Sequence, residues 1–198
     1  MKLTAENLRK GYDGRYVLDG VSFAVASGET LLITGESGCG KTTLVRLILG
    51  LEKPDDGIFR VDGRETVPGG RTLTAAAVFQ ENRLCGSRTA LDNIIAAAPS
   101  LSKAAVREEI ARLLPPGNAD KRVAALSGGM QRRVAILRAC LAESDILVMD
   151  EPLTGLDRAN AAKVLDYIEE KRCGRPLIMT AHHADGLKYD DRLTLERL

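Results

Sequence analysis

Short apolar stretches separated by glycine and aspartate occupy the first sixty residues, and this pattern is typical of strands. We expect strands at residues 3–8, 17–18, 21–25 and 58–61, the last followed by a turn at Asp62 and Gly63. Stretches this short, joined by tight turns, favour antiparallel neighbours. The N-terminal region is therefore predicted to form a small antiparallel β layer.

From residue 30 onward the pattern changes to apolar strands that alternate with helical stretches. We expect strands at 30–34, 75–79, 146–149 and 177–180. Helices are expected at 41–49, 103–114 and 158–172, with a further helix capped by Ser127. Such alternation indicates an α/β fold with a mainly parallel sheet.

The length and charge of the chain limit the classes of protein that it can belong to. A chain of 198 residues fits one α/β domain, so we expect a single domain over 1–198. The 28 basic and 27 acidic residues nearly cancel, which argues against a nucleic-acid partner. The short basic pair Arg132–Arg133 lies in a helical pattern and is interpreted as part of a solvated helix face.

Nothing in the sequence predicts a membrane span or an extracellular protein. No apolar run approaches the roughly eighteen residues that a membrane helix needs, and the N-terminus lacks the apolar segment of a secretory signal. The four cysteines have neither CxxC nor histidine-paired spacing, so they are expected to be reduced thiols. We therefore expect a cytoplasmic location.

Residues 35–43 match the phosphate-loop pattern GxxxxGK[ST], between a predicted strand and a predicted helix. In such a loop, glycines let backbone N–H groups curl around phosphate oxygens, and the start of the helix adds the positive end of its dipole. Lys41 is expected to reach the β- and γ-phosphates, and the Thr42 hydroxyl to bind Mg²⁺. The residues assigned to nucleotide binding are Gly35, Glu36, Ser37, Gly38, Cys39, Gly40, Lys41, Thr42 and Thr43.

The phosphate loop alone leaves alternatives open. A glycine-rich turn can merely connect a strand to a helix, and a true phosphate loop indicates only the broad class of P-loop NTPases. A second motif favours a phosphate loop over a plain turn, because the apolar run at 146–149 is followed by two carboxylates. Asp150 is placed to hold Mg²⁺ and Glu151 to polarise a water molecule for attack on the γ-phosphate. The alternative for this pair is a solvated strand end.

Residues 126–133 read LSGGMQRR at the start of a predicted helix, and they form a second candidate anion site. Ser127, Gly128 and Gly129 would present a hydroxyl and free N–H groups to a phosphate. This segment resembles the LSGGQ signature of the ABC-transporter ATPases, with Met130 where the family usually has Gln. The resemblance implies a head-to-tail pair of subunits, in which each signature closes over the ATP of the other. An ordinary serine-capped helix is the alternative.

Four further positions follow the order of the family's motifs. Gln80 resembles the glutamine that binds Mg²⁺ and water and senses the γ-phosphate, and Asp157 the aspartate of the subunit seam. His182 resembles the histidine that contacts the γ-phosphate, with His183 as the rival. Tyr12 resembles the aromatic residue that stacks on adenine, the alternative being a tyrosine of the core or of a strand edge.

The resemblance spans nearly the whole chain and implies a fold, an activity and partners. The fold would be a P-loop NTPase core with an N-terminal antiparallel β subdomain and a helical signature subdomain inserted at about 84–142. The chain would bind Mg²⁺ and ATP and hydrolyse the ATP together with a second subunit, in a homodimer. A transmembrane permease in another polypeptide, with a solute-binding protein, would complete a transporter at the inner face of the membrane.

Two stretches, at 78–84 and 91–94, resemble ATPases of the nitrate, sulfonate and taurine import group. The residues do not identify the cargo, the direction of transport, the permease or whether the two subunits are identical. Two alternatives remain open at this point: an ABC ATPase that drives a cytosolic machine, and a subunit that binds nucleotide without hydrolysing it.

Overall fold

The computed structural model describes residues 1–66, 73–184 and 186–198. Contacts within the chain divide it into two compact units, which are described separately below. The strand unit comprises Met1–Ala77, Ser144–Glu151 and Gly174–Leu198, and the helical unit comprises Val78–Glu143 and Pro152–Cys173. The predicted helical insertion at about 84–142 lies inside the helical unit, which also takes in Pro152–Cys173.

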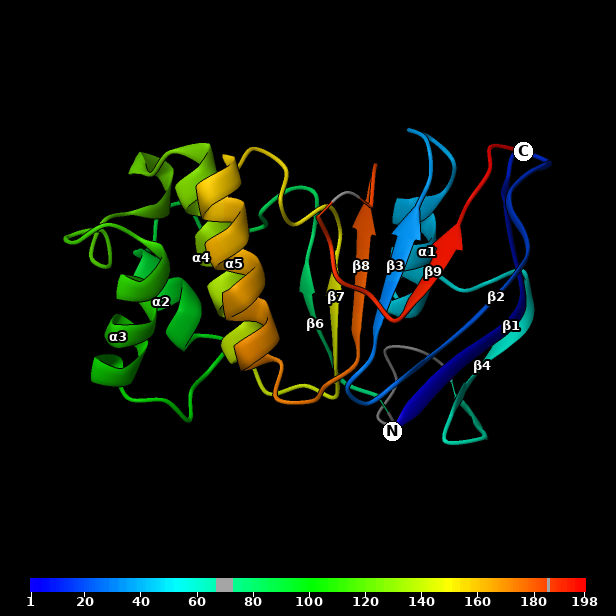
Figure 1. Ribbon diagram of the computed structural model, residues 1–198, viewed down its shortest axis with the longest axis horizontal. Helices are drawn as coiled ribbons and strands as arrows, with labels where there is room; N and C mark the ends of the chain where they lie inside the picture. Colours follow the sequence, from blue (N-terminus) through cyan, green and yellow to red (C-terminus); the bar gives the residue numbers. More distant parts are fainter. Residues whose placement is uncertain (67–72, 185) are drawn as a thin grey trace. The chain divides into compact units, whose positions relative to one another are not determined.

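An antiparallel sheet forms the N-terminal part of the strand unit (Figure 1). Its strand order is β2-β1-β4-β5, with β1 at Lys2–Tyr12, β2 at Arg15–Ala26, β4 at Asp56–Val61 and β5 at Arg64–Thr66. Asp62 and Gly63, between β4 and β5, have φ angles of 49° and 79°, as a tight hairpin turn requires. The predicted antiparallel layer and its turn are confirmed.

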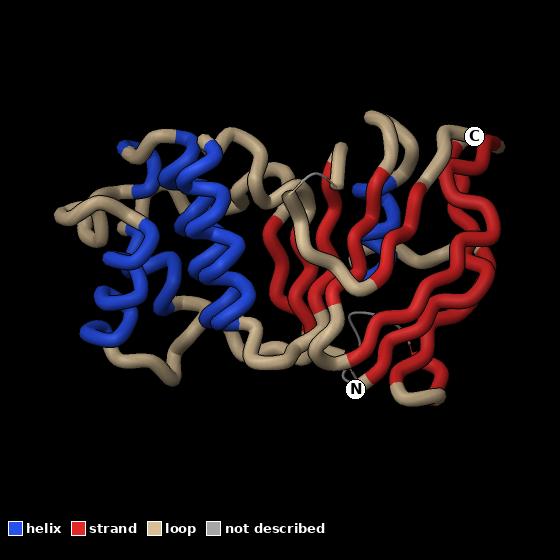
Figure 2. Tube along the Cα trace, in the orientation of Figure 1, coloured by secondary structure: helices blue, strands red, loops and turns tan. Residues whose placement is uncertain are grey.

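The second sheet of the strand unit is the mainly parallel sheet that the alternating pattern predicted (Figure 2). Its strand order is β6-β7-β8-β3-β9, with β3 at Thr30–Thr34, β6 at Ala75–Val78, β7 at Ile146–Met149, β8 at Leu177–Ala181 and β9 at Asp191–Thr194. Every residue of β3 and β7 is buried, which explains why both are short apolar runs. Helix α1, Lys41–Ile48, follows β3.

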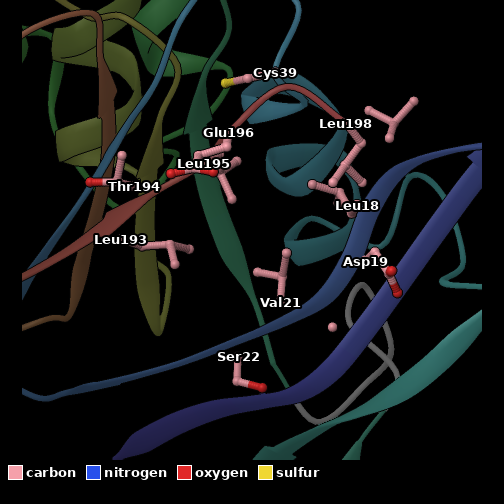
Figure 3. A pocket seen from close by; sticks show the side chains of 12 residues that line it. Leu18, Asp19, Val21, Ser22, Cys39, Leu193, Thr194, Leu195, Glu196 and Leu198 are labelled. Carbon is pink, nitrogen blue, oxygen red and sulfur yellow. The ribbon is translucent and has the colours of Figure 1, made fainter.

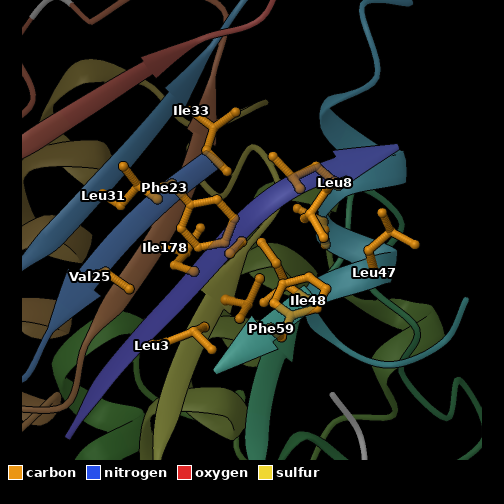
Figure 4. Packing of buried hydrophobic residues seen from close by; sticks show 14 of the residues in the cluster. Leu3, Leu8, Phe23, Val25, Leu31, Ile33, Leu47, Ile48, Phe59 and Ile178 are labelled. Atoms are coloured by element: carbon orange, nitrogen blue, oxygen red, sulfur yellow. The ribbon is translucent and has the colours of Figure 1, made fainter. Parts of the chain in front are cut away.

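A common apolar core joins the two sheets and helix α1 (Figure 4). Leu47 and Ile48 of α1 are at most 1% exposed and belong to the same cluster as Leu8 of β1. Phe59 of β4 meets Phe23 of β2 edge to face, with ring centroids 6.4 Å apart. Burial on this scale supplies the main driving force for holding α1, and the loop before it, in place.

The helical unit contains α2 (Ala90–Ile95), α3 (Lys103–Leu113), α4 (Gly128–Leu141) and α5 (Arg158–Lys171), with a 3₁₀ turn at Val123–Ala125. Ser127 is the N-cap of α4, as predicted. Ion pairs link α3 to α5, with Arg112 on Glu170 and Lys171 on Glu109. None of the helices in the described parts of the chain combines the length and apolarity needed to cross a membrane.

Several sequence predictions were wrong or incomplete. The strands expected at 17–18 and 21–25 are one strand, β2, because β1 pairs with both parts through Leu18 and Val21. The basic pair Arg132–Arg133 is not a solvated face, since Arg132 is 5% exposed and donates to backbone carbonyls. Strands β5 and β9 and helix α2 went unpredicted, because they are three to six residues long and two of them are largely polar.

The core makes a prediction about stability. Replacing Phe59, which is 2% exposed, by alanine removes a ring from the centre of the cluster. We expect the free energy of unfolding to fall by about 3–5 kcal/mol, measured by urea titration. Tyr16→Ala is the control, because Tyr16 is 55% exposed and its loss should cost less than about 1 kcal/mol. Equal effects of the two changes would contradict this description of the core.

Candidate functional site

The phosphate loop, residues 35–43, runs from the end of β3 into the first turn of α1. Gly38 and Gly40 have φ angles of 81° and 100°, which side-chain-bearing residues rarely adopt. A Cβ atom on Gly35 would lie 2.4 Å from the carbonyl oxygen of Leu195 and 2.5 Å from Cys39 Sγ. The curled path that can surround a phosphate is therefore available only to glycine at these positions.

Lys41 places a buried positive charge inside this loop. It is 6% exposed, and its Nζ donates to the carbonyl oxygens of Gly35 (2.6 Å) and Glu36 (2.9 Å). Both acceptors are uncharged backbone carbonyls, so they do not neutralise the ammonium charge, which a phosphate would neutralise. The amide groups of the first turn of α1 add to this field. The residues fit a nucleotide phosphate.

Asp150, just after β7, is the polar centre of the site. It is 2% exposed, and its carboxylate accepts hydrogen bonds from Thr42 Oγ1 at Oδ2 (3.0 Å) and from Thr180 Oγ1 at Oδ1 (2.7 Å). A threonine hydroxyl and a carboxylate oxygen held this close form the pair of hard oxygen ligands that Mg²⁺ prefers. Thr42 and Asp150, predicted from separate motifs, are brought together.

Thr180 is a site residue that the sequence analysis did not assign. It is fully buried at the end of β8, and it accepts a hydrogen bond from the Glu151 N–H (2.9 Å) while donating to Asp150. Because Met149 of β7 pairs with Met179 of β8, the next residues, Asp150 and Thr180, lie beside each other. Only the register of this parallel pair could have revealed the contact, and no sequence motif carries it.

Glu151 and His182 form the next contact outward. Glu151 has a φ angle of 48°, which turns the chain sharply after β7, and its Oε1 lies 3.0 Å from His182 Nε2. The Glu151 side chain is 10% exposed and that of His182 is 49% exposed. The structure thus brings His182, and not its rival His183, to the carboxylate that was assigned to water activation.

Tyr12 lies at the other end of the phosphate loop. Its hydroxyl donates to Glu52 and interacts with the side chain of Thr43, the last residue of the loop. Burial of the hydroxyl and its hydrogen bond with Glu52 raise the pKa of Tyr12. The residue is 42% exposed, which leaves ring surface open to a stacking partner such as a base.

The signature residues are defined within the helical unit. Ser127 and Gly128 are exposed at the start of α4, and the Ser127 Oγ accepts from the Met130 N–H (3.4 Å). The backbone at Gly129 packs closely against Gly155, since a Cβ atom on Gly129 would lie 3.3 Å from the Gly155 carbonyl oxygen. The open end of a long helix is an anion-binding feature, as its first N–H groups have no partner within the helix.

Asp157 and Gln80 also lie in the helical unit. Asp157 caps α5, accepting from the Asn160 N–H (2.9 Å) and Nδ2 (2.6 Å), and these bonds lower the pKa of its carboxyl. Gln80 is exposed, and its backbone carbonyl accepts from Arg132 Nη2 (2.6 Å). The predicted residues therefore fall into two groups: Tyr12, residues 35–43, Asp150, Glu151 and His182 in the strand unit, and Gln80, Ser127, Gly128, Gly129 and Asp157 in the helical unit.

A cavity of about 430 Å³ lies between β2 and β9 (Figure 3). Its lining includes Cys39 of the phosphate loop together with Leu18, Leu193 and Leu195. It contains neither Lys41 nor the carboxylates Asp150 and Glu151. This cavity is therefore distinct from the polar side chains that can hold a phosphate and a metal ion.

The Thr180 hydroxyl makes a testable prediction. Thr180→Val keeps the side-chain shape but removes the hydroxyl that donates to the Asp150 carboxylate and accepts from the Glu151 N–H. We expect the free energy of unfolding in urea to fall by about 1–3 kcal/mol. Thr180→Ser keeps the hydroxyl and should recover at least half of that loss. A valine variant as stable as the wild type would contradict the role given to this hydroxyl.

Comparison with known proteins places the chain in a family. The family described as "ABC transporter" matches residues 18–154. The chain is 36% identical to an Fe(3+) ions import ATP-binding protein, FbpC 1, of Rhodococcus jostii, over 98% of this chain and 59% of that protein. It is also 36% identical to an aliphatic sulfonates import ATP-binding protein, SsuB, of Cupriavidus necator, over 94% of this chain and 63% of that protein. The chain thus spans about three fifths of the length of these relatives.

A solved structure agrees with these relatives in fold. The dimeric post-hydrolysis state of the ATP-binding cassette MJ0796, bound to ADP and Pi, superimposes with a TM-score of 0.85 at 25% identity, covering 98% of this chain and 96% of that one. The predicted P-loop NTPase fold, with its antiparallel β layer and signature helices, is confirmed by this likeness together with the sheets described above. The chain belongs to the ABC transporter family of ATP-binding cassettes.

Proposed function

We propose that this chain binds Mg²⁺ and ATP, hydrolyses the ATP, and serves as the nucleotide-binding subunit of an ABC transporter. The observation that carries the proposal is that two segments far apart in the sequence meet: Lys41 and Thr42 of the phosphate loop, and Asp150 and Glu151 after β7. A buried ammonium, a hydroxyl–carboxylate pair and a second carboxylate are the groups that phosphoryl transfer to water requires.

Each residue has a chemical role in this proposal. Lys41 offsets negative charge on the β- and γ-phosphates. Glu151 accepts a proton from the attacking water while the oxygen of that water bonds to the γ-phosphorus. The bond from that phosphorus to the β–γ bridging oxygen breaks, which leaves ADP and phosphate. Mg²⁺, when bound by Thr42 and Asp150, neutralises charge on the phosphate oxygens. His182, 3.0 Å from Glu151, orients the carboxylate and is the candidate for contact with the γ-phosphate.

The nucleotide contacts beyond this group follow from the family resemblance. Tyr12 is assigned to the adenine ring, and its partial exposure beside Thr43 supports this assignment. Gln80 is assigned to the metal ion, to water and to sensing of the γ-phosphate. Ser127, Gly128 and Gly129 are assigned to the ATP of a second subunit, and Asp157 to the seam between subunits. The exposed start of α4 supports the assignment of Ser127, Gly128 and Gly129. The dimeric cassette of similar fold supports that assignment and the assignment of Asp157.

The partners and cargo of the proposed transporter are inferred from the relatives. A second copy of this chain would complete each ATP site, and a separate transmembrane permease, with a solute-binding protein, would carry the cargo. The names of the relatives, which are import ATP-binding proteins, support import, and we place the chain at the inner face of the membrane as part of this proposal. A sulfonate-type importer is the proposal from the sequence, although the Fe(3+) and sulfonate relatives are equally identical to this chain.

Hydrolysis can be tested by replacing the proposed base. Glu151→Gln keeps the side-chain size but removes the group that accepts a proton, so release of phosphate from MgATP should fall at least about 100-fold. Glu108→Gln, an exposed change in α3, is the matched control and should leave the rate within about twofold. If the Glu151 variant released phosphate as fast as the wild type, Glu151 would not be the catalytic residue.

The two-subunit arrangement can be tested with the same variant. Glu151→Gln should retain ATP between two chains, because bridging by the γ-phosphate persists when hydrolysis stops. Size-exclusion chromatography in MgATP should therefore show a dimer, while MgADP should leave the chain monomeric. A monomer in both nucleotides, at concentrations that saturate the site, would contradict the proposal that two chains share each ATP.

A further inference from the structure

The turn that carries Gln80, residues 79–83, is attached to α4 by a buried arginine. Arg132 Nη1 donates to the carbonyl oxygen of Phe79 (2.5 Å) and Nη2 to that of Gln80 (2.6 Å). The residue is 5% exposed, and all three residues belong to the helical unit. A planar guanidinium that bridges two consecutive carbonyls fixes both the distance and the orientation of the turn. Removing it would take both donors away from these carbonyl oxygens.

A second arginine of α4 attaches the same turn at another point. Arg138 Nη1 donates to the carbonyl oxygen of Arg83 (2.9 Å) and Nη2 to that of Asn82 (3.4 Å). Positions 132 and 138 are six residues apart, or about 9 Å along a helix that rises 1.5 Å per residue. Attachment at two separated points prevents the turn from rotating against the helix.

The turn itself is compact. Arg83 has a φ angle of 45°, which folds the chain back, and its guanidinium carbon lies 3.9 Å from the centre of the Phe79 ring. This stacking closes the segment on itself, in addition to its attachment to α4. Residues 79–83 and helix α4 therefore have the contacts of a single rigid element.

The neighbouring arginine shows that this attachment is particular to Arg132. Arg133 Nε donates to the carbonyl oxygen of Gly129 (3.3 Å), and its Nη1 to Asn160 Oδ1 of α5 (3.1 Å). Arg133 thus links the start of α4 to α5, whereas Arg132, one residue earlier, binds the Gln80 turn. Arg132 lies only five residues after the cap Ser127, so a displacement of the turn acts close to the open end of α4.

We propose that Arg132 is a positioning residue that couples the Gln80 turn to the signature end of α4. A displacement of Gln80 on nucleotide binding would move Ser127 and Gly128 with it. ATP bound to one subunit would therefore change how well the Ser127 end of that subunit binds the ATP of its partner. This inference rests on the proposed function, in which Gln80 senses the γ-phosphate. Arg132 acts through Gln80 and Ser127, and it makes no contact with the reacting atoms itself.

Hydrogen–deuterium exchange on the full chain tests the coupling. In the wild type, MgATP should slow amide exchange in both 79–85 and 128–133. Arg132→Met keeps the aliphatic stem but removes the donors, so exchange in 79–85 should rise at least about tenfold without nucleotide, and the MgATP effect on 128–133 should disappear. Arg132→Lys should restore part of that effect, because an ammonium can still donate to one of the two carbonyls.

A control separates this role from general destabilisation. Arg112→Met removes an arginine of the same unit that binds Glu170, away from the Gln80 turn. It should leave exchange in 79–85 and the MgATP effect on 128–133 unchanged, even if it lowers the melting temperature as much as Arg132→Met does. An Arg132→Met chain with the wild-type response in both segments would overturn the coupling. The proposed function is tested by different measurements, phosphate release and dimer formation by Glu151→Gln. Those measurements do not depend on Arg132, so the function and the coupling can fail independently.

Discussion

The buried carboxylate of Asp150 is the point on which the candidate site depends. Asp150 is 2% exposed, so its charge would be costly to bury without hydrogen-bond partners. Each carboxylate oxygen accepts from a hydroxyl, one from Thr42 of the phosphate loop and one from Thr180 of β8. This arrangement exists because β7 and β8 run parallel with Met149 beside Met179, so that their carboxyl ends meet at one edge of the sheet. A shift of one residue in that register would turn Asp150 to the opposite face of the sheet.

Packing of the strand unit then determines the path of the phosphate loop. Helix α1 is held in the core that the two sheets share, and β9 brings the Leu195 carbonyl so close to Gly35 that no side chain fits there. The loop must therefore curl in a conformation open only to glycine, with the Lys41 ammonium inside it. The same packing that stabilises the unit prepares the backbone for an anion.

The helical unit leaves the start of a long helix, α4, exposed. Ser127 and Gly128 remain exposed, while the buried Arg132 and the half-buried Arg138 of α4 donate to backbone carbonyls of residues 79–83.

Local pattern was sufficient to predict most of the helices and strands and the phosphate-loop motif, because strand and helix periodicity, glycine turns and the GxxxxGK[ST] spacing all act over a few residues. It predicted β3 and β7 with their bounds, the Ser127 cap, and the pairing of a phosphate loop with two carboxylates. Contacts between distant residues were decided by the tertiary structure alone. Strand register placed Thr180 against Asp150, the turn after β8 brought His182 rather than His183 to Glu151, and burial made Arg132 an anchor for the Gln80 turn instead of a solvated side chain. Such contacts depend on which strands and helices become neighbours in space, and no short stretch of sequence contains that information.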